Sequence, residues 1–130
     1  MLNYLMVGLG AAAGGMTRYW LAGVVQKVFP AIMPYGTLSV NIAGGLLIGL
    51  IMFYLDTGNL VSPPMKLLLT VGFCGGLTTF SAFSYETLFL LTESEYFNAA
   101  VNVFLNVFLA LIATSVGLLA AKFIGGFHGN

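Results

Sequence analysis

The sequence predicts an all-α membrane protein of four transmembrane helices, the third of which is broken in mid-membrane. Three observations support this fold class. Hydrophobic residues make up 59% of the 130 residues and charged residues only 6%, with a mean hydropathy of +1.00. The sequence contains four apolar segments, each long enough for a spanning helix, which needs roughly 20 mostly apolar residues. The third of these segments carries paired glycines and threonines near its centre.

The four segments are expected to form a single transmembrane domain over residues 1–130. We predict helices at about 3–28, 36–55, 64–91 and 96–124. The four basic and four acidic side chains are too few to cover the surface of a soluble domain of this size. Membrane lipid must therefore solvate most of the surface, and we expect a multi-pass protein of the cell inner (plasma) membrane.

The first two predicted helices carry small residues at a spacing of four. Gly10 and Gly14 form such a pair in the first helix, and Gly45 and Gly49 follow Asn41 in the second. Ridges of this kind let the backbones of neighbouring helices approach closely. We interpret them as packing surfaces.

The third predicted helix has a poor helical interior. Residues 72–81 read GFCGGLTTFS, in which two adjacent glycines precede two β-branched threonines. A break in mid-membrane is tolerated only where protein or a water-filled cavity satisfies the freed backbone groups. A mild kink packed against a neighbour is the alternative interpretation, but the hydroxyl groups around the segment favour a functional break.

Ionisable side chains inside a membrane are costly and usually face a cavity or a partner. Arg18 lies near one end of the first helix, where it could snorkel to the headgroups or attract an anion. Glu86 follows the predicted break by about two turns. Asn41 lies five residues into the second helix, one turn after Thr37.

The fourth helix carries three amides at steps of four, at Asn98, Asn102 and Asn106. Asparagines can join helices by hydrogen bonds, which is the simpler interpretation. The alternative is a polar track along which an ion exchanges water for amide donors.

Two phenylalanines follow the predicted break. Phe80 and Phe83 are three residues apart and therefore share a helix face, with the hydroxyl groups of Thr79 and Ser81 nearby. Most membrane phenylalanines face lipid or the core. An aromatic ring nevertheless has a positive edge, so two rings beside hydroxyl and amide donors could form a weak anion site. Weak binding suits conduction, because an ion that is held too tightly cannot leave.

The charge distribution excludes some functions and leaves the orientation in the membrane open. The net charge is zero, which gives no basic surface for nucleic acid. Lys66 and Lys122 lie on the side of both termini, and Lys27 and Arg18 lie on or near the other, so the positive charges set no orientation. A weak charge bias, or lipid and the insertion machinery, could set a single orientation. Alternatively, the chain inserts both ways and pairs as an antiparallel dual-topology homodimer. Four short helices enclose little interior, which favours the homodimer.

Three sequence motifs are similar to those of one known family. Residues 72–86, GFCGGLTTFSAFSYE, closely resemble the third-helix signature of the CrcB/Fluc fluoride channels. Residues 36–44 match the second-helix motif of that family and residues 14–19 resemble its first-helix motif. With the length and the four helices, the resemblance covers essentially the whole chain.

The resemblance implies a passive, highly selective channel that exports fluoride from the cytoplasm. Members are dual-topology homodimers with two antiparallel pores and a central structural Na⁺, which backbone carbonyls of both broken helices hold. By motif position, these carbonyls belong here to Gly75 and Thr78. The residues on pathway or entrance positions include Phe80, Phe83, Asn41, Thr79, Ser81, Arg18 and Glu86.

The fourth helix departs from the family pattern. Where the family often has a tyrosine and a serine four residues apart on a polar track, this sequence has Asn102 and Asn106. Both amides remain hydrogen-bond donors. We therefore expect them, with Thr37 beside Asn41, to belong to the fluoride pathway.

Two other functions remain as alternatives. A small multidrug exporter is also a four-helix dual-topology dimer, but it needs a membrane carboxylate for proton exchange, and the first helix has none. A non-transporting membrane scaffold would have no use for a costly break. An enzyme is not expected, since no phosphate-binding loop, dinucleotide fingerprint or serine–histidine–carboxylate set is present.

Overall fold

A computed structural model describes residues 1–56 and 61–126, and within these ranges the chain contains helices and no strand. The elements in order are α1 (Leu2–Val28), α2 (Tyr35–Asp56), α3 (Pro63–Leu67), η1 (Leu68–Cys74), α4 (Gly75–Leu77), α5 (Phe80–Thr92) and α6 (Tyr96–Gly126). The predicted first, second and fourth helices correspond to α1, α2 and α6, with ends that differ by one or two residues. The predicted third helix is divided into α3, η1, α4 and α5.

The structure supports a multi-pass membrane protein. Within the described residues, three helical segments are long and apolar enough to cross a membrane, namely Tyr35–Phe53, Pro63–Thr92 and Tyr96–Gly125. The 27-residue α1 is long enough as well, but its many glycines and its Arg18 and Lys27 make it less apolar. Its membrane span therefore stays a prediction.

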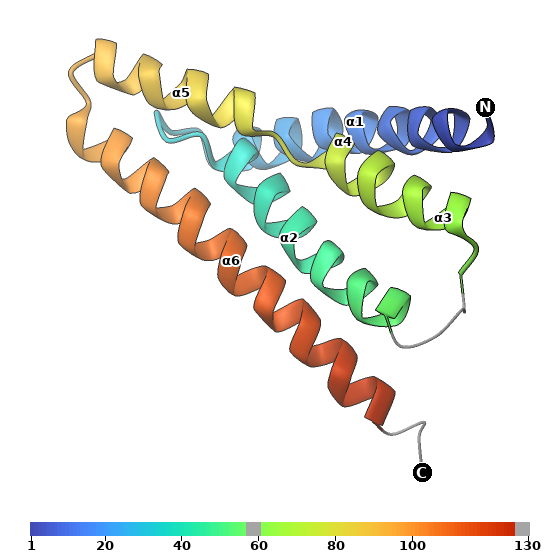
Figure 1. The fold of residues 1–130 in the computed structure, drawn as a ribbon. Coiled ribbons are helices and arrows are strands. Elements are labelled where there is room, and N and C mark those ends of the chain that lie inside the picture. Colours follow the sequence, from blue (N-terminus) through green and yellow to red (C-terminus); the bar gives the residue numbers. More distant parts are fainter. Residues whose placement is uncertain (57–60, 127–130) are drawn as a thin grey trace.

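The helices pack in two pairs that meet at the centre of the molecule (Figure 1). α2 lies along α6, and α1 lies along η1 and α4. After α5 the chain reverses direction, and the first part of α6 packs against α5. The turn between the two helices contains Ser94 in a left-handed conformation with φ 62°. The turns that join α1 to α2 and α5 to α6 lie toward one end of the molecule, and the N-terminal end of α1 and the C-terminal end of α6 lie toward the other (Figure 1).

Small residues allow the close approach within both pairs. A Cβ atom on Gly10 or Gly14 of α1 would collide with backbone carbonyl oxygens of η1, and one on Gly49 of α2 would collide with the carbonyl oxygen of Thr114. The packing role predicted for these ridges is therefore confirmed. Gly8, which pairs with Ala12 at the same spacing, is an exception, because a Cβ there would meet no atom of the described residues within 4 Å.

Replacement of Gly49 with alanine is expected to lower the free energy of unfolding by about 1–3 kcal/mol, because the added methyl group meets backbone that cannot move aside. Thermal unfolding in detergent measures the change. Gly23→Ala is the matched control, since its Cβ meets no atom of residues 1–56 or 61–126 within 4 Å and alanine favours the helix. Equal destabilisation by both substitutions would contradict the packing role of Gly49.

The break in the third helix lies at the two threonines. Thr78 (φ −81°, ψ 158°) and Thr79 (φ −151°, ψ 119°) are extended, a conformation that suits β-branched side chains. Gly75 and Gly76 remain helical, and a Cβ on Gly76 would lie 2.6 Å from the carbonyl oxygen of Ala11. The predicted break is present, but Gly76 serves packing against α1 and the two threonines interrupt the helix.

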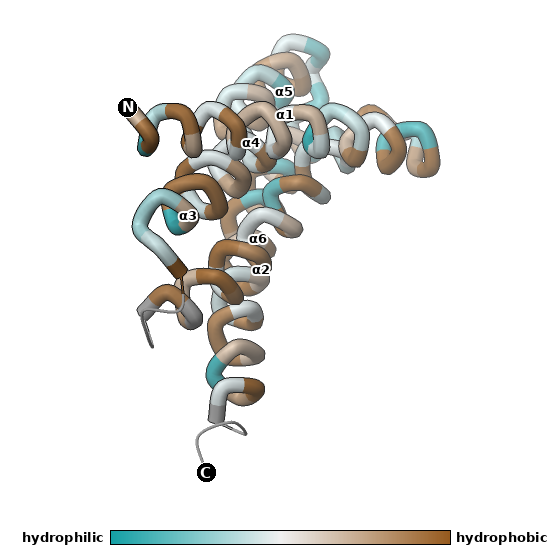
Figure 2. The backbone as a smooth tube through the Cα atoms, turned by 90° about the vertical axis from the view of Figure 1, so that its right-hand side faces the viewer, coloured by the Kyte–Doolittle hydropathy of each residue, from teal (hydrophilic) through white to brown (hydrophobic). Residues whose placement is uncertain are grey.

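Apolar residues recur along all the long helices, as the brown segments of Figure 2 show. Large side chains such as Phe97, Leu111 and Phe123 are more than half exposed. The small buried cluster of Met33, Leu90 and Ala99 lies where α5, α6 and the α1–α2 turn meet. A surface of this kind belongs in lipid or against another copy.

Candidate functional site

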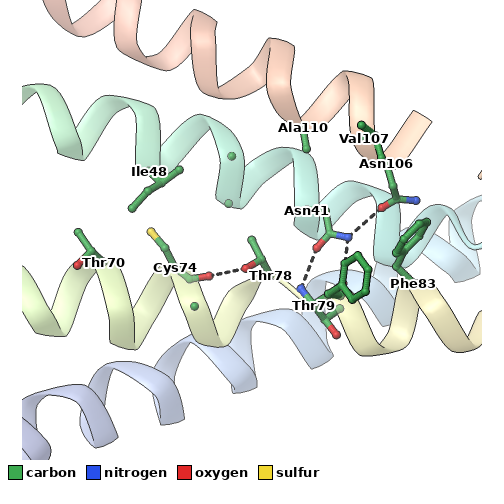
Figure 3. A pocket seen from close by; sticks show the side chains of 14 residues that line it. Asn41, Ile48, Thr70, Cys74, Thr78, Thr79, Phe83, Asn106, Val107 and Ala110 are labelled. Carbon is green, nitrogen blue, oxygen red and sulfur yellow. Dashed lines mark hydrogen bonds between the residues drawn. The ribbon is translucent and has the colours of Figure 1, made fainter. Parts of the chain in front are cut away.

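An open pocket of about 410 Å³ lies beside the break, between α2, the broken third helix and α6 (Figure 3). Seven of the predicted site residues contribute to its lining: Asn41, Gly75, Thr78, Thr79, Phe80, Phe83 and Asn106. The remaining lining is small or apolar, from Gly44, Gly45, Ile48, Thr70, Cys74, Val107 and Ala110. Residues from positions 41 to 110 thus meet at one site.

Asn41 of α2 holds the extended backbone of Thr79 by two hydrogen bonds. The backbone amide of Thr79 donates to Asn41 Oδ1 over 2.8 Å, and Asn41 Nδ2 donates to the Thr79 carbonyl over 3.2 Å (Figure 3). In an unbroken helix the Thr79 amide would instead donate to the carbonyl of Gly75. Asn41 therefore supplies an acceptor for the Thr79 amide, which the break releases from its helical hydrogen bond.

The Thr79 side chain begins the helix that follows the break. Its Oγ1 accepts a hydrogen bond from the backbone amide of Ala82 over 3.2 Å, which is an N-cap of α5. The hydroxyl of Ser81 lies 3.3 Å from the same oxygen. Both hydroxyl groups thus lie at the start of α5, beside the pocket.

Arg18 reaches the break from α1. Its guanidinium donates to the Thr78 carbonyl over 3.2 Å, and the side chain is partly buried. Of the two interpretations drawn from the sequence, snorkelling to the headgroups does not describe this contact. A positive charge lies next to the extended segment instead.

The amides of α6 continue the polar contacts. Asn41 Nδ2 donates to Asn106 Oδ1 over 2.9 Å, and Asn106 Nδ2 donates to Asn102 Oδ1 over 2.9 Å and to the Asn102 carbonyl over 3.1 Å. Asn102 Nδ2 donates to Thr87 Oγ1 over 2.9 Å, and that hydroxyl donates to the Phe83 carbonyl over 2.8 Å. Asn102 is 0% exposed and lies behind Asn106, outside the pocket lining.

Glu86 and Thr37 form a separate pair away from the pocket lining. The Thr37 hydroxyl donates to Glu86 Oε1 over 2.5 Å. Glu86 Oε2 is buried, and within the described part of the chain it has no hydrogen-bond partner. The structure therefore brings these two predicted residues together but not into the pocket.

The two phenylalanines pack edge to face. Their ring centroids are 5.4 Å apart and their planes are inclined at 62°. Phe83 is buried, whereas Phe80 is 78% exposed on the open side of the pocket. The hydrogen-bearing edge of an aromatic ring carries positive charge, so rings at this site can favour an anion.

Sequence reasoning did not select Thr87 as a site residue. Its position four residues after Phe83 places it on the same face of α5, where it contacts both Asn102 and the Phe83 carbonyl. That spacing was the available signal. Spacing within α5 could not predict the contact of Thr87 with Asn102 on α6.

Comparisons with known proteins agree with these features. Residues 5–118 match the model of the family described as CrcB-like protein, Camphor Resistance (CrcB). A Geotalea daltonii protein named "Fluoride-specific ion channel FluC" is 46% identical over 124 residues, which cover 95% of this chain and all of that protein. Proteins with the same name from Geobacter metallireducens and Flavobacterium psychrophilum are 45% and 44% identical over 122 residues, which cover 94% of this chain and 98% of each relative.

Among the residues that the structure describes, three helical segments are long and apolar enough to cross a membrane. The third helix is broken beside a pocket, and these relatives match over nearly their whole length. The chain therefore belongs to the CrcB-like protein family.

Proposed function

We propose that this protein is a passive, highly selective channel that exports fluoride from the cytoplasm, and not an enzyme. The observation that carries the proposal is the extended segment Thr78–Thr79, which opens beside a pocket lined by two phenylalanine rings. The names of the relatives, "Fluoride-specific ion channel FluC", support the same ion.

The fluoride ion passes the pocket without meeting a strong, permanent ligand. The edges of Phe80 and Phe83 and the hydroxyl groups of Thr79 and Ser81 replace part of its water, and Asn41 and Asn106 form the polar wall. Arg18 adds positive charge beside the break. A path of compact donors selects the small fluoride ion against chloride, and weak binding lets it leave.

Two oppositely inserted copies complete the pathway. In the single chain the pocket is open and Phe80 is largely exposed, so a second copy is needed to enclose an ion route. The balanced positive charges, with Lys66 and Lys122 against Lys27 and Arg18, permit both orientations. The dimer then holds two antiparallel pores.

A structural Na⁺ at the centre of the dimer fits the backbone here in part. Because the Thr79 amide donates to Asn41, the Gly75 carbonyl loses its usual helical donor, and Na⁺ prefers such oxygen ligands. The Thr78 carbonyl already accepts from Arg18, so only its second lone pair would be available. The carbonyl oxygens of Gly75 and Thr78 would bind the ion, which would link the broken third helices of the two copies.

Fluoride efflux from proteoliposomes, recorded with a fluoride electrode, tests this function. The purified protein is expected to release trapped fluoride down its gradient, with chloride efflux at the level of protein-free liposomes. No proton gradient should be needed. Fluoride retention would exclude the channel, and proton-driven transport of a cationic drug would favour a multidrug exporter, although α1 contains no Asp or Glu.

A further inference from the structure

A line of hydrogen bonds connects the break in the third helix with the middle of α5 through two other helices. We call Asn41, Asn106, Asn102 and Thr87 the amide network. It begins at the backbone of Thr79 and ends at the Phe83 carbonyl, so both ends are fixed by main-chain groups. Thr37 and Glu86 are not part of it.

The end at Phe83 fixes the direction of every bond. The hydroxyl proton of Thr87 is used for the Phe83 carbonyl, so Thr87 Oγ1 can only accept from Asn102 Nδ2. Asn102 therefore turns its Oδ1 toward Asn106, which must present Nδ2 to it and to the Asn102 main-chain carbonyl. Asn106 is left with Oδ1 for Asn41.

The end at Thr79 requires the same direction. The Thr79 amide can only donate and its carbonyl can only accept, so Asn41 must present Oδ1 to the first and Nδ2 to the second. The remaining Nδ2 proton of Asn41 then meets Asn106 Oδ1. Turning over any one amide would place two donors or two acceptors against each other.

The network leaves no amide proton of Asn41 or Asn106 for an ion. Asn41 Nδ2 donates to the Thr79 carbonyl and Asn106, and Asn106 Nδ2 donates to two oxygens of Asn102. Asn102 is wholly buried. These side chains are therefore suited to hold backbone in place rather than to bind an anion.

We propose that Thr87, Asn102 and Asn106 are positioning residues, which orient the amide of Asn41 so that it keeps Thr79 extended and the third helix broken. The network is a structural property of the chain. Only its effect on ion flux rests on the proposed function.

Site-resolved hydrogen exchange of the Thr79 amide in the full-length protein tests the proposal. Thr87→Val removes the hydroxyl with little change in volume, so Asn102 loses its anchor. The Thr79 amide is then expected to exchange about tenfold faster, because its hydrogen bond to Asn41 is less firmly held. Thr87→Ser keeps the hydroxyl and should return the exchange rate to the wild-type value.

Thr114→Val is the matched control. The Thr114 hydroxyl also donates to the carbonyl four residues before it, that of Ala110, and this bond is not part of the amide network. This variant should leave the exchange of the Thr79 amide unchanged. Asn102→Leu removes the central amide and should accelerate exchange at Thr79 at least as much as Thr87→Val.

Fluoride efflux measured on the same variants separates the two proposals. Slower efflux with faster Thr79 exchange in Thr87→Val, both restored in Thr87→Ser, supports the positioning role. Wild-type exchange at Thr79 in both Thr87→Val and Asn102→Leu overturns it, as does an Asn106→Leu variant that loses efflux at an unchanged exchange rate. If the wild-type protein passes no fluoride while Thr79 exchange responds as stated, the positioning role stands and the fluoride channel fails.

Discussion

Replacement of Phe80 with isoleucine is expected to reduce fluoride efflux from proteoliposomes by about 100-fold, which corresponds to a barrier higher by about 2.7 kcal/mol. Isoleucine is apolar but has no ring and therefore no positive edge to face the ion. Because the Phe80 side chain is 78% exposed, its loss removes little packing within the chain. The expected change is therefore in flux and not in the unfolding temperature.

Phe97→Ile provides the control for Phe80→Ile. Phe97 is 80% exposed, close to the exposure of Phe80, but it lies at the start of α6 and outside the pocket lining. Efflux through this variant should equal that of the wild type. Unchanged efflux in Phe80→Ile would remove the ring from the mechanism, and an equal loss in both variants would show a general effect on membrane insertion.

The helices themselves could be predicted from the sequence because their determinant is local. Long apolar segments fold as helices in a membrane, where backbone groups must pair within the segment. The ends of α2 and α6 accordingly differ little from prediction. The π-helical segment η1, which packs against α1, was not predicted, because no pattern within the apolar segment distinguishes it from an α-helix.

The break was predicted for a reason that proved only partly right. Two adjacent glycines weaken a helix by entropy, yet Gly76 stays helical because α1 packs against it. The helix ends where an external partner replaces its hydrogen bonds, and that partner is Asn41, 38 residues away from Thr79. A local sequence pattern can indicate where a helix is unstable, but it cannot indicate which distant residue replaces the helical hydrogen bonds.

The residue types of the site could be selected from the sequence, but their tasks could not. Asn41, Asn102 and Asn106 were predicted to lie on the fluoride pathway, and hydrogen bonds that join helices were the simpler interpretation of the two α6 amides. In the structure their amide groups bond to one another and to backbone. Which atoms an amide uses depends on contacts between α2 and α6, which no spacing within one helix reveals.

Asn41→Asp is expected to reduce fluoride efflux more than Phe80→Ile does. The carboxylate can still accept from the Thr79 amide, but it cannot donate to the Thr79 carbonyl or to Asn106 Oδ1. Two acceptors without a donor cost about 1–3 kcal/mol each. The free energy of unfolding should therefore fall by about 2–6 kcal/mol, measured by thermal unfolding in detergent.

The same substitution places a negative charge in the wall of an anion pathway. A fluoride ion about 4 Å from a carboxylate is repelled by about 4 kcal/mol at an effective dielectric constant of 20. Fluoride efflux should therefore fall by about 1,000-fold. Asn3→Asp adds the same charge at the exposed start of α1 and should leave efflux unchanged.

Asn41→Leu separates the two causes, because it removes the hydrogen bonds to Thr79 without adding charge. If Asn41 acts only by holding Thr79 extended, Asn41→Leu should lose stability and some efflux, and the further loss in Asn41→Asp measures repulsion of the ion at the pocket wall. Equal efflux in both variants would mean that the ion passes too far from Asn41 to sense its charge. Wild-type stability in Asn41→Leu would show that the extended conformation of Thr79 needs no contact with α2, and the account of the break given above would then be wrong.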